Sequence, residues 1–212
     1  MKALLCTLPL LLSASLAAAP LSHYQDSWAE IKYQVAEKQQ EDAFAALREQ
    51  VQAELKAHPD DPGYLIWSAI ISASYAGAKG GIGALKYVKE AKAELEQSLK
   101  LDDKALGGSA YTSLGSLYYQ VPGWPIGFGD DDKAEENLKK ALAINPDGID
   151  PNFFYGDFLL EERRYQEALQ YLTKALAAPD RPGRALADAG RRAEIKDKLA
   201  KVNAKLEKRK KK

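Results

Sequence analysis

Two segments in the second half of the chain share one pattern of glycine, alanine and large residues. The period is 34 residues, from Ala134 to Ala168. The first segment reads Tyr111-x2-Leu114-Gly115-x2-Tyr118, then Ala134-x3-Leu138-x2-Ala141, and the second reads Asn152-x2-Tyr155-Gly156-x2-Leu159, then Ala168-x3-Leu172-x2-Ala175. A repeat of this length is typical of helical arrays, in which each unit buries its apolar face against the next unit. This constraint on the fold is stronger than any that composition supplies.

The pattern has a direct physical reading as two packed helices per unit. Gly115 and Gly156 let the first helix of each unit approach the second, and large residues at i+3 and i+4 spacing fill the space between units. In "INPDG", Pro146 and Gly148 stop the second helix of the first unit. These segments resemble the tetratricopeptide repeat, a family whose units are helical hairpins.

Weaker copies of the pattern precede these two units. "AKAELEQSLKLDD" and "EDAFAALREQVQAELKAHPDD" read as second helices, with first helices expected in "PGYLIWSAIISASYA" and "SWAEIKYQVAEK". The phase of the apolar residues in the "PGYLIWSAIISASYA" helix is ambiguous. We therefore predict an all-α superhelix (solenoid) of about four hairpins over residues 20–183, with the best repeats at 108–146 and 149–179. Residues 184–212 are predicted to form an amphipathic helix that caps the array, followed by a basic tail.

The N-terminus has the organisation of a secretory signal, assigned to residues 1–19. Lys2 leads into "ALLCTLPLLLSASLAAA", an apolar run that ends in small residues, and cleavage after Ala17 or Ala19 fits this pattern. The single cysteine, Cys6, lies too early for the cysteine that a bacterial lipid anchor needs. The sequence thus predicts a periplasmic protein without a lipid anchor or a stable membrane insertion.

Composition argues against several classes of function. Thirty basic and thirty acidic residues cancel, which gives no basic field for nucleic acid. A mature chain without cysteine excludes disulfides and thiol catalysis. His23 and His58 have no neighbouring nucleophile motif. We predict a protein that is not an enzyme and needs no cofactor or metal.

The first strong repeat carries an insertion. Gly115 and Ala134 are 19 residues apart, whereas the equivalent Gly156 and Ala168 are 12 apart, so seven extra residues fall in "QVPGWPIGFGDDD". Its three aspartates lack the alternating spacing of a calcium loop, and Asp132 with Glu135 fits a helix-capping box. Two alternatives stay open for Trp124, Pro125 and Phe128: an apolar plug folded inward, or a rigid aromatic contact for a partner.

The insertion also carries a narrower resemblance. "GALKYVKEAKAELEQSLKLD", "GSAYTSLGSLYYQVPGWPIGFGDDDKAEENLKKALAINPDG" and "YGDFLLEERRYQEALQYLTKAL" resemble the periplasmic T-component (TatT) family of TRAP transporters, over roughly residues 60–180. The resemblance implies an accessory protein of an uptake system that binds a solute-binding protein or a hydrophobic ligand and forms homo-oligomers. A free periplasmic scaffold or assembly factor, and a carrier of a small apolar ligand, are the alternatives.

Repeat spacing predicts which residues line the concave face of the superhelix. A partner protein or peptide with a basic or apolar strip would suit this mixed polar and aromatic surface, whose acidic residues gather at one end. The predicted lining residues are Ser109, Thr112, Ser116, Tyr119, Gln120, Asp150, Phe153, Asp157, Leu160 and Glu161.

Overall fold

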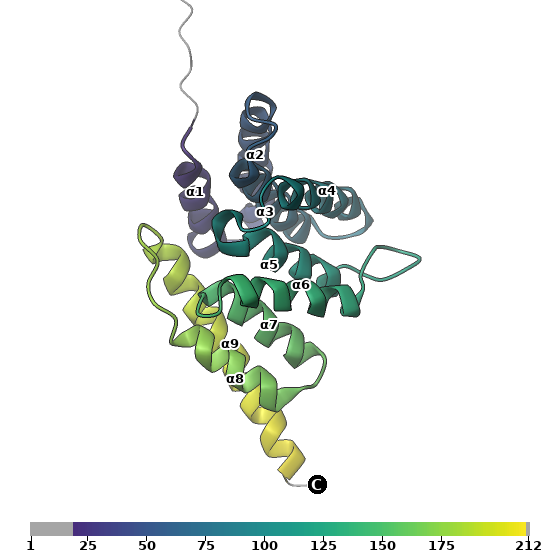
Figure 1. Cartoon of the computed structure of the whole chain (residues 1–212), viewed down its shortest axis with the longest axis vertical. Coiled ribbons are helices and arrows are strands. Elements are labelled where there is room, and N and C mark those ends of the chain that lie inside the picture. Colours follow the sequence, from purple (N-terminus) through teal and green to yellow (C-terminus); the bar gives the residue numbers. More distant parts are fainter. Residues whose placement is uncertain (1–18, 211–212) are drawn as a thin grey trace, which may run out of the picture.

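The computed structural model describes residues 19–210, which form a superhelix of packed helices (Figure 1). Residues 1–18 of the predicted signal segment lie outside the described part. The helices are α1 (Leu21–Gln34), α2 (Glu37–Ala57), α3 (Pro62–Lys79), η1 (a 3-10 turn, Ile82–Ala84), α4 (Leu85–Leu101), α5 (Ala105–Gln120), α6 (Asp131–Ile144), α7 (Ile149–Glu161), α8 (Tyr165–Leu176) and α9 (Ala185–Lys210). The most extensive contacts join α3 to α4, α5 to α6 and α7 to α8. The predicted all-α superhelix is confirmed.

Each strong repeat is held together by a glycine of its first helix and a leucine of its second. A Cβ atom on Gly115 would lie 2.6 Å from Cγ of Leu138, and one on Gly156 would lie 2.8 Å from Cγ of Leu172. Both leucines are fully buried. The helices therefore approach at a distance that any larger residue would widen.

The helix α3 lies between two apolar clusters. Ile66 and Ala69 belong to a cluster that extends through α5, α7 and α8, whereas Trp67 and Ile71 belong to a cluster with α1 and α2. Because α3 is apolar on two faces, its sequence has no single apolar stripe.

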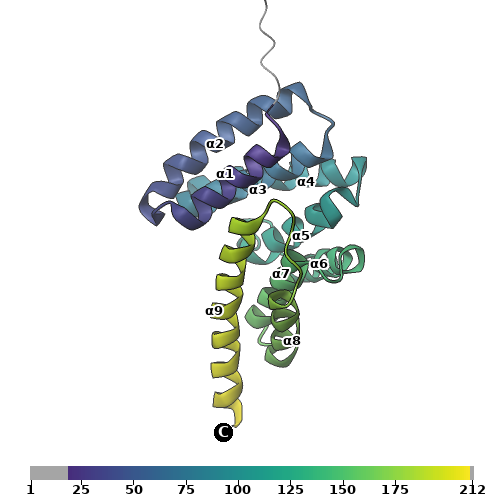
Figure 2. The same ribbon diagram turned by 90° about the vertical axis from the view of Figure 1, so that its left-hand side faces the viewer.

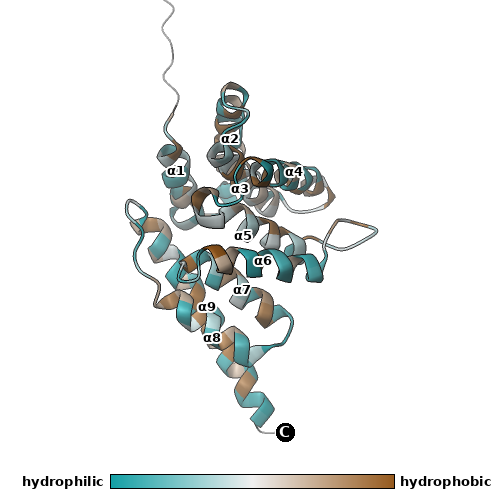
Figure 3. Cartoon of the chain, in the orientation of Figure 1, coloured by the Kyte–Doolittle hydropathy of each residue, from teal (hydrophilic) through white to brown (hydrophobic). Residues whose placement is uncertain are grey.

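By contrast, α6 shows a polar outer face (Figure 3). No helix within residues 19–210 is both long and apolar enough to cross a bilayer.

The helix α9 does more than cover the last repeat. It packs on α8 and α7, and its first half also contacts α1, at the opposite end of the chain. Figure 2 shows this long helix running past α7 and α8 toward the α1–α3 group. At the contact, Gly190 faces the ring of Tyr33 so closely that a Cβ atom would lie 2.4 Å from it. The superhelix is thus bridged between its first and last helices.

The predicted capping box at the start of α6 is wrong. Asp130 is the capping residue, and its Oδ1 accepts a hydrogen bond from the backbone N–H of Lys133 at 3.0 Å. Helical geometry begins one residue later, so Asp131 and Asp132 already lie in the first turn. Glu135 turns instead toward the next repeat, where its Oε1 accepts from Tyr155 Oη at 2.9 Å and Arg164 Nη1 at 2.7 Å.

We expect Gly115→Ala to lower the free energy of unfolding by about 1–3 kcal/mol, because its methyl group would collide with Leu138. Gly77→Ala in α3 is the matched control. A Cβ atom there meets nothing within 4 Å, so the same change should raise stability by about 0.5–1 kcal/mol. Urea unfolding followed by circular dichroism measures both. Equal effects of the two substitutions would contradict this account of hairpin packing.

The Glu135 ion-pair network predicts a pH dependence. Burial alone would raise the pKa of Glu135, but hydrogen bonds from Arg164, Lys139 and Tyr155 lower this pKa to about 2. The lowered pKa stabilises the fold above the ordinary value near 4.5, and this contribution is lost as the pH falls toward 2.

Glu135→Gln should therefore cost about 1–2 kcal/mol at pH 7, and the difference from the wild type should narrow between pH 5 and pH 3. The neighbouring Glu136→Gln, whose side chain is 61% exposed, should change stability by less than about 0.5 kcal/mol. A pH-independent difference for Glu135→Gln would show that the charge has no such role.

Candidate functional site

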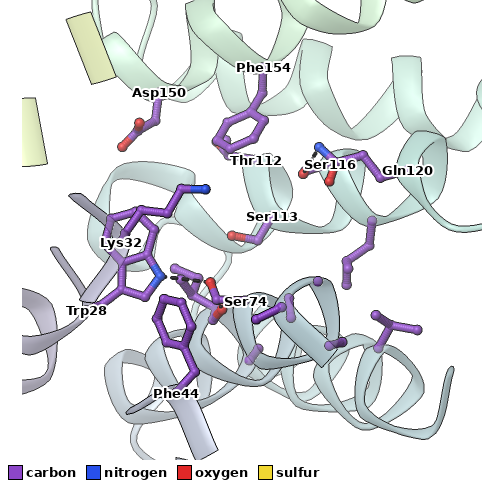
Figure 4. A pocket seen from close by; sticks show the side chains of 18 of the residues that line it. Trp28, Lys32, Phe44, Ser74, Thr112, Ser113, Ser116, Gln120, Asp150 and Phe154 are labelled. Atoms are coloured by element: carbon purple, nitrogen blue, oxygen red, sulfur yellow. Dashed lines mark hydrogen bonds between the residues drawn. The ribbon is translucent and has the colours of Figure 1, made fainter. Parts of the chain in front are cut away.

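The concave side of the superhelix is a groove of about 1230 Å³. Helices α1, α2, α3, α4, α5, α7 and α9 all contribute to its walls, together with η1. Labelled side chains from α1, α2, α3, α5 and α7 surround this space in Figure 4. This groove is the candidate functional site.

The helix α5 supplies a strip of small hydroxyl and amide side chains to the groove. Four of the predicted residues lie in this strip: Ser109, Thr112, Ser116 and Gln120. Ser113, which was not predicted, lies in the strip as well. Gln120 Nε2 donates to Ser116 Oγ at 3.0 Å, while the buried Oγ1 of Thr112 has no hydrogen-bond partner among the described residues. Opposite this strip, Trp28 Nε1 donates to Ser74 Oγ at 2.8 Å (Figure 4). The strip can exchange hydrogen bonds with a bound chain.

One end of the groove, here called the arginine end, consists of Trp28, Lys32, Trp67, Asp150 and Arg184. Asp150 accepts hydrogen bonds from Arg181 at 2.6 Å and from Arg191 at 2.9 Å. Burial would raise the pKa of Asp150, but these guanidinium groups lower it. Its negative charge is therefore neutralised within the chain.

The second predicted aspartate of α7 is neutralised in the same way. Asp157 accepts a hydrogen bond from Tyr119 Oη at 3.1 Å and forms an ion pair with Lys198 of α9. Because α9 brings bases to both aspartates, α7 offers no unpaired acid within the groove for the basic strip that the sequence suggested. The alternative expectation, a partner with an apolar strip, does not depend on these aspartates.

At the other end lies an apolar surface, here called the loop-side patch: Ile82, Leu85, Val88, Leu117, Val121 and Ile126. It combines the two enlarged connections, between α3 and α4 and between α5 and α6. Ile82 is 86% exposed and Ile126 is 60% exposed, although both are large aliphatic residues. Water-facing side chains of this kind at one concave site favour the binding of an apolar group.

The insertion, residues 121–130, folds into a tight loop that projects from the superhelix (Figure 1). The N–H of Gly129 donates to the carbonyl oxygen of Pro122 at 3.0 Å, and a Cβ atom at Gly129 would lie 1.9 Å from the carbonyl oxygen of Val121. The two aromatic residues take different positions. Phe128 packs edge-on against Tyr118, with ring centroids 5.7 Å apart, whereas Trp124 is 90% exposed.

Several predicted site residues lie outside the groove. Tyr119 turns toward α7 through its hydrogen bond to Asp157, and Leu160 is buried in the core. Glu161 is exposed at the end of α7, away from the groove. Trp124, Pro125 and Phe128 belong to the projecting loop and do not line the groove, whereas Phe153 does.

Sequence reasoning missed the wall opposite α5. Trp28, Phe44 and Trp67 line the groove from α1, α2 and α3. The aromatic residues in the predicted first helices could have indicated this wall. However, α3 is apolar on two faces, so its sequence does not show which face lies on the concave side of the superhelix. Arg184 had no sequence signal, because it reaches the groove only through the return of α9.

The side chains that line the groove are mainly apolar, hydroxyl, amide and charged groups. Among residues 19–210, no group of three or more histidine, cysteine, aspartate or glutamate side chains could hold a metal ion. The lining side chains can instead act through hydrogen bonds, apolar contact and charge. The arrangement is suited to non-covalent binding.

Comparison with known proteins agrees with the repeat pattern. Residues 126–189 match the tetratricopeptide repeat family, over the segment that contains the second strong repeat. No curated protein matches the chain. The chain is similar to the crystal structure of a thermophilic TPR protein of Thermus thermophilus, at 18% identity and a TM-score of 0.43, covering 84% of this chain and 99% of that one.

The loop geometry predicts opposite outcomes for its two aromatic residues. Trp124→Ala should change the free energy of unfolding by less than about 0.5 kcal/mol, because the side chain is exposed. Phe128→Ala should lower it by about 1–2 kcal/mol, because the half-buried ring packs on Tyr118. Thermal and urea unfolding measure both. A large loss of stability in Trp124→Ala would show that the tryptophan is a structural plug.

Proposed function

We propose that this chain is a non-enzymatic, exported binding module that holds a segment of a partner protein in its concave groove. The observation that carries the proposal is the groove itself, which combines a hydrogen-bonding strip on α5 with exposed aliphatic residues at the loop-side patch. A polypeptide segment presents the same mixture of backbone hydrogen-bonding groups and apolar side chains.

The finer assignment rests on the resemblance stated above. We propose that the protein acts in the periplasm as an accessory component of a TRAP-type uptake system, with a solute-binding protein as its partner. The signal-like N-terminus and the proline- and tryptophan-containing insertion support this proposal. N-terminal sequencing of protein from the cell envelope should then begin after Ala17 or Ala19.

A carrier of a small apolar ligand is the second candidate. The exposed Ile82 and Ile126 favour it, because a hydrocarbon ligand would cover both side chains. Mass spectrometry of the purified protein under native conditions distinguishes the two functions. A retained small molecule would favour the carrier, and an empty groove would favour the binding module.

Site-specific photo-crosslinking in the source cells tests partner binding directly. A benzophenone amino acid at Ser113, inside the groove, should give a discrete adduct with one other protein that mass spectrometry can identify. The same amino acid at Glu136, on the exposed face of α6, is the control and should give no such adduct. The proposal fails if Ser113 gives no adduct or if both positions crosslink equally.

A further inference from the structure

Arg184 differs from the other basic residues of the groove because it has no ion-pair partner in the part of the chain that the structure describes. Five basic and four acidic side chains line the groove: Lys32, Arg181, Arg184, Arg191 and Lys198, with Glu37, Asp150, Asp157 and Glu194. Arg181, Arg191 and Lys198 each pair with an acid, and Lys32 Nζ lies 3.9 Å from Glu194 Oε1. Within residues 19–210, no carboxylate oxygen lies within 4.0 Å of the Arg184 guanidinium.

The surroundings hold this guanidinium in a partly desolvated position. Its Cζ atom lies 4.9 Å from the ring centroid of Trp67, and its buried Nε has no hydrogen-bond partner in the described part of the chain. Burial and the nearby positive charge of Arg181 lower the pKa of Arg184. Asp150, Asp26 and Asp188 act in the opposite direction. Asp150 and Asp188 are already hydrogen-bonded to Arg181, and Asp26 forms no ion pair with Arg184 within 4.0 Å.

An unpaired cation in such a place is a site for an anionic group. A guanidinium with open donors binds a carboxylate through strong, charge-assisted hydrogen bonds. The remaining unpaired acid of the groove, Glu37, does not compete, because it is exposed in the first turn of α2, where the helix dipole favours a negative charge. Lys32, Arg181, Arg191 and Lys198 are paired with Asp150, Asp157, Asp188 and Glu194, so Arg184 is the base of the groove that is left to receive a negative charge from outside.

The arginine end and the loop-side patch lie at opposite ends of the α5 strip. Arg184 stacks on Trp67, which contacts Trp28, and Trp28 lies at the end of the groove opposite Gln120 in Figure 4. The chain continues from Gln120 into Val121 and Ile126 of the patch. A bound segment can therefore place an acidic group at one end and apolar side chains at the other.

We propose that Arg184 binds a carboxylate of the partner segment while the apolar side chains of that segment lie on the loop-side patch. This inference rests on the proposed function and adds the chemistry of the partner: an acidic and apolar polypeptide segment. The carboxylate belongs either to an aspartate or glutamate side chain or to the end of the partner chain.

Affinity selection from soluble random peptides tests the inference. Two pools differ only in their C-termini, one ending in free acid and the other in amide, and bound peptides are identified by mass spectrometry. We expect peptides rich in apolar residues with a carboxylate, and a loss of about 10-fold or more in their affinity for Arg184→Gln. Acidic side chains enriched in both pools identify a side-chain carboxylate, and enrichment confined to the free-acid pool identifies the chain end.

Lys201→Gln is the matched control, because it removes one positive charge from an exposed site on α9 outside the groove. It should leave peptide affinity unchanged. Arg184→Gln should keep an unfolding temperature within a few degrees of the wild type, since no ion pair is broken. If that variant does not fold, Arg184→Lys replaces it. Arg184→Lys keeps the charge but loses the planar fork, so carboxylate peptides should bind it more weakly than the wild type.

The outcomes separate this inference from the proposed function. Selection of apolar peptides without carboxylates, selection of basic peptides, or equal affinity for the wild type and the Arg184 variant would overturn the inference alone. If neither pool yields enriched peptides, the proposed function of the groove fails, and the inference fails with it.

Discussion

The guanidinium of Arg191 joins three parts of the chain that are far apart in sequence. It lies on α9, donates to Asp150 of α7 at 2.9 Å and to Glu194 at 2.6 Å, and stacks on Phe153 and Phe154 at 4.3 and 4.8 Å. Glu194 in turn accepts a hydrogen bond from Tyr33 of α1 at 3.4 Å. A buried charge is costly unless its partners are fixed, so this network holds α1, α7 and α9 in one arrangement.

This closure determines what the groove can bind. An open superhelix would expose Asp150 and Asp157 of α7 to a partner. The connection from α8 to α9 places Arg181 beside Asp150, and α9 itself places Arg191 beside Asp150 and Lys198 beside Asp157. The acidic end of the repeat array thereby becomes internally paired, and the charge that remains unpaired in the groove, apart from Glu37 at its helix terminus, is positive.

The sequence was most informative where packing is local. Glycine and leucine spacing predicted the hairpins, because Gly115 and Leu138 meet within one repeat. The same periodicity predicted the residues of the α5 strip. It did not predict that the Tyr119 side chain turns toward α7, because this orientation depends on a hydrogen bond to Asp157 in the next repeat. The position of Arg184 could not be predicted, because it depends on the contact between α9 and α1, whose residues are separated by most of the chain.

Among residues 19–210, most large apolar residues that the fold leaves exposed lie at the groove and the projecting loop, and Leu101 at the end of α4 is the exception. Ile82, Leu106 and Ile126 line the groove, and Trp124 stands at the loop tip. Leu106 also has a positive φ of 48°, a conformation that costs a leucine about 1 kcal/mol and that glycine or asparagine would adopt more easily. Neither burial nor backbone geometry explains a leucine there. Contact with the partner segment proposed above would account for both its exposure and its position, as it would for the loop-side patch.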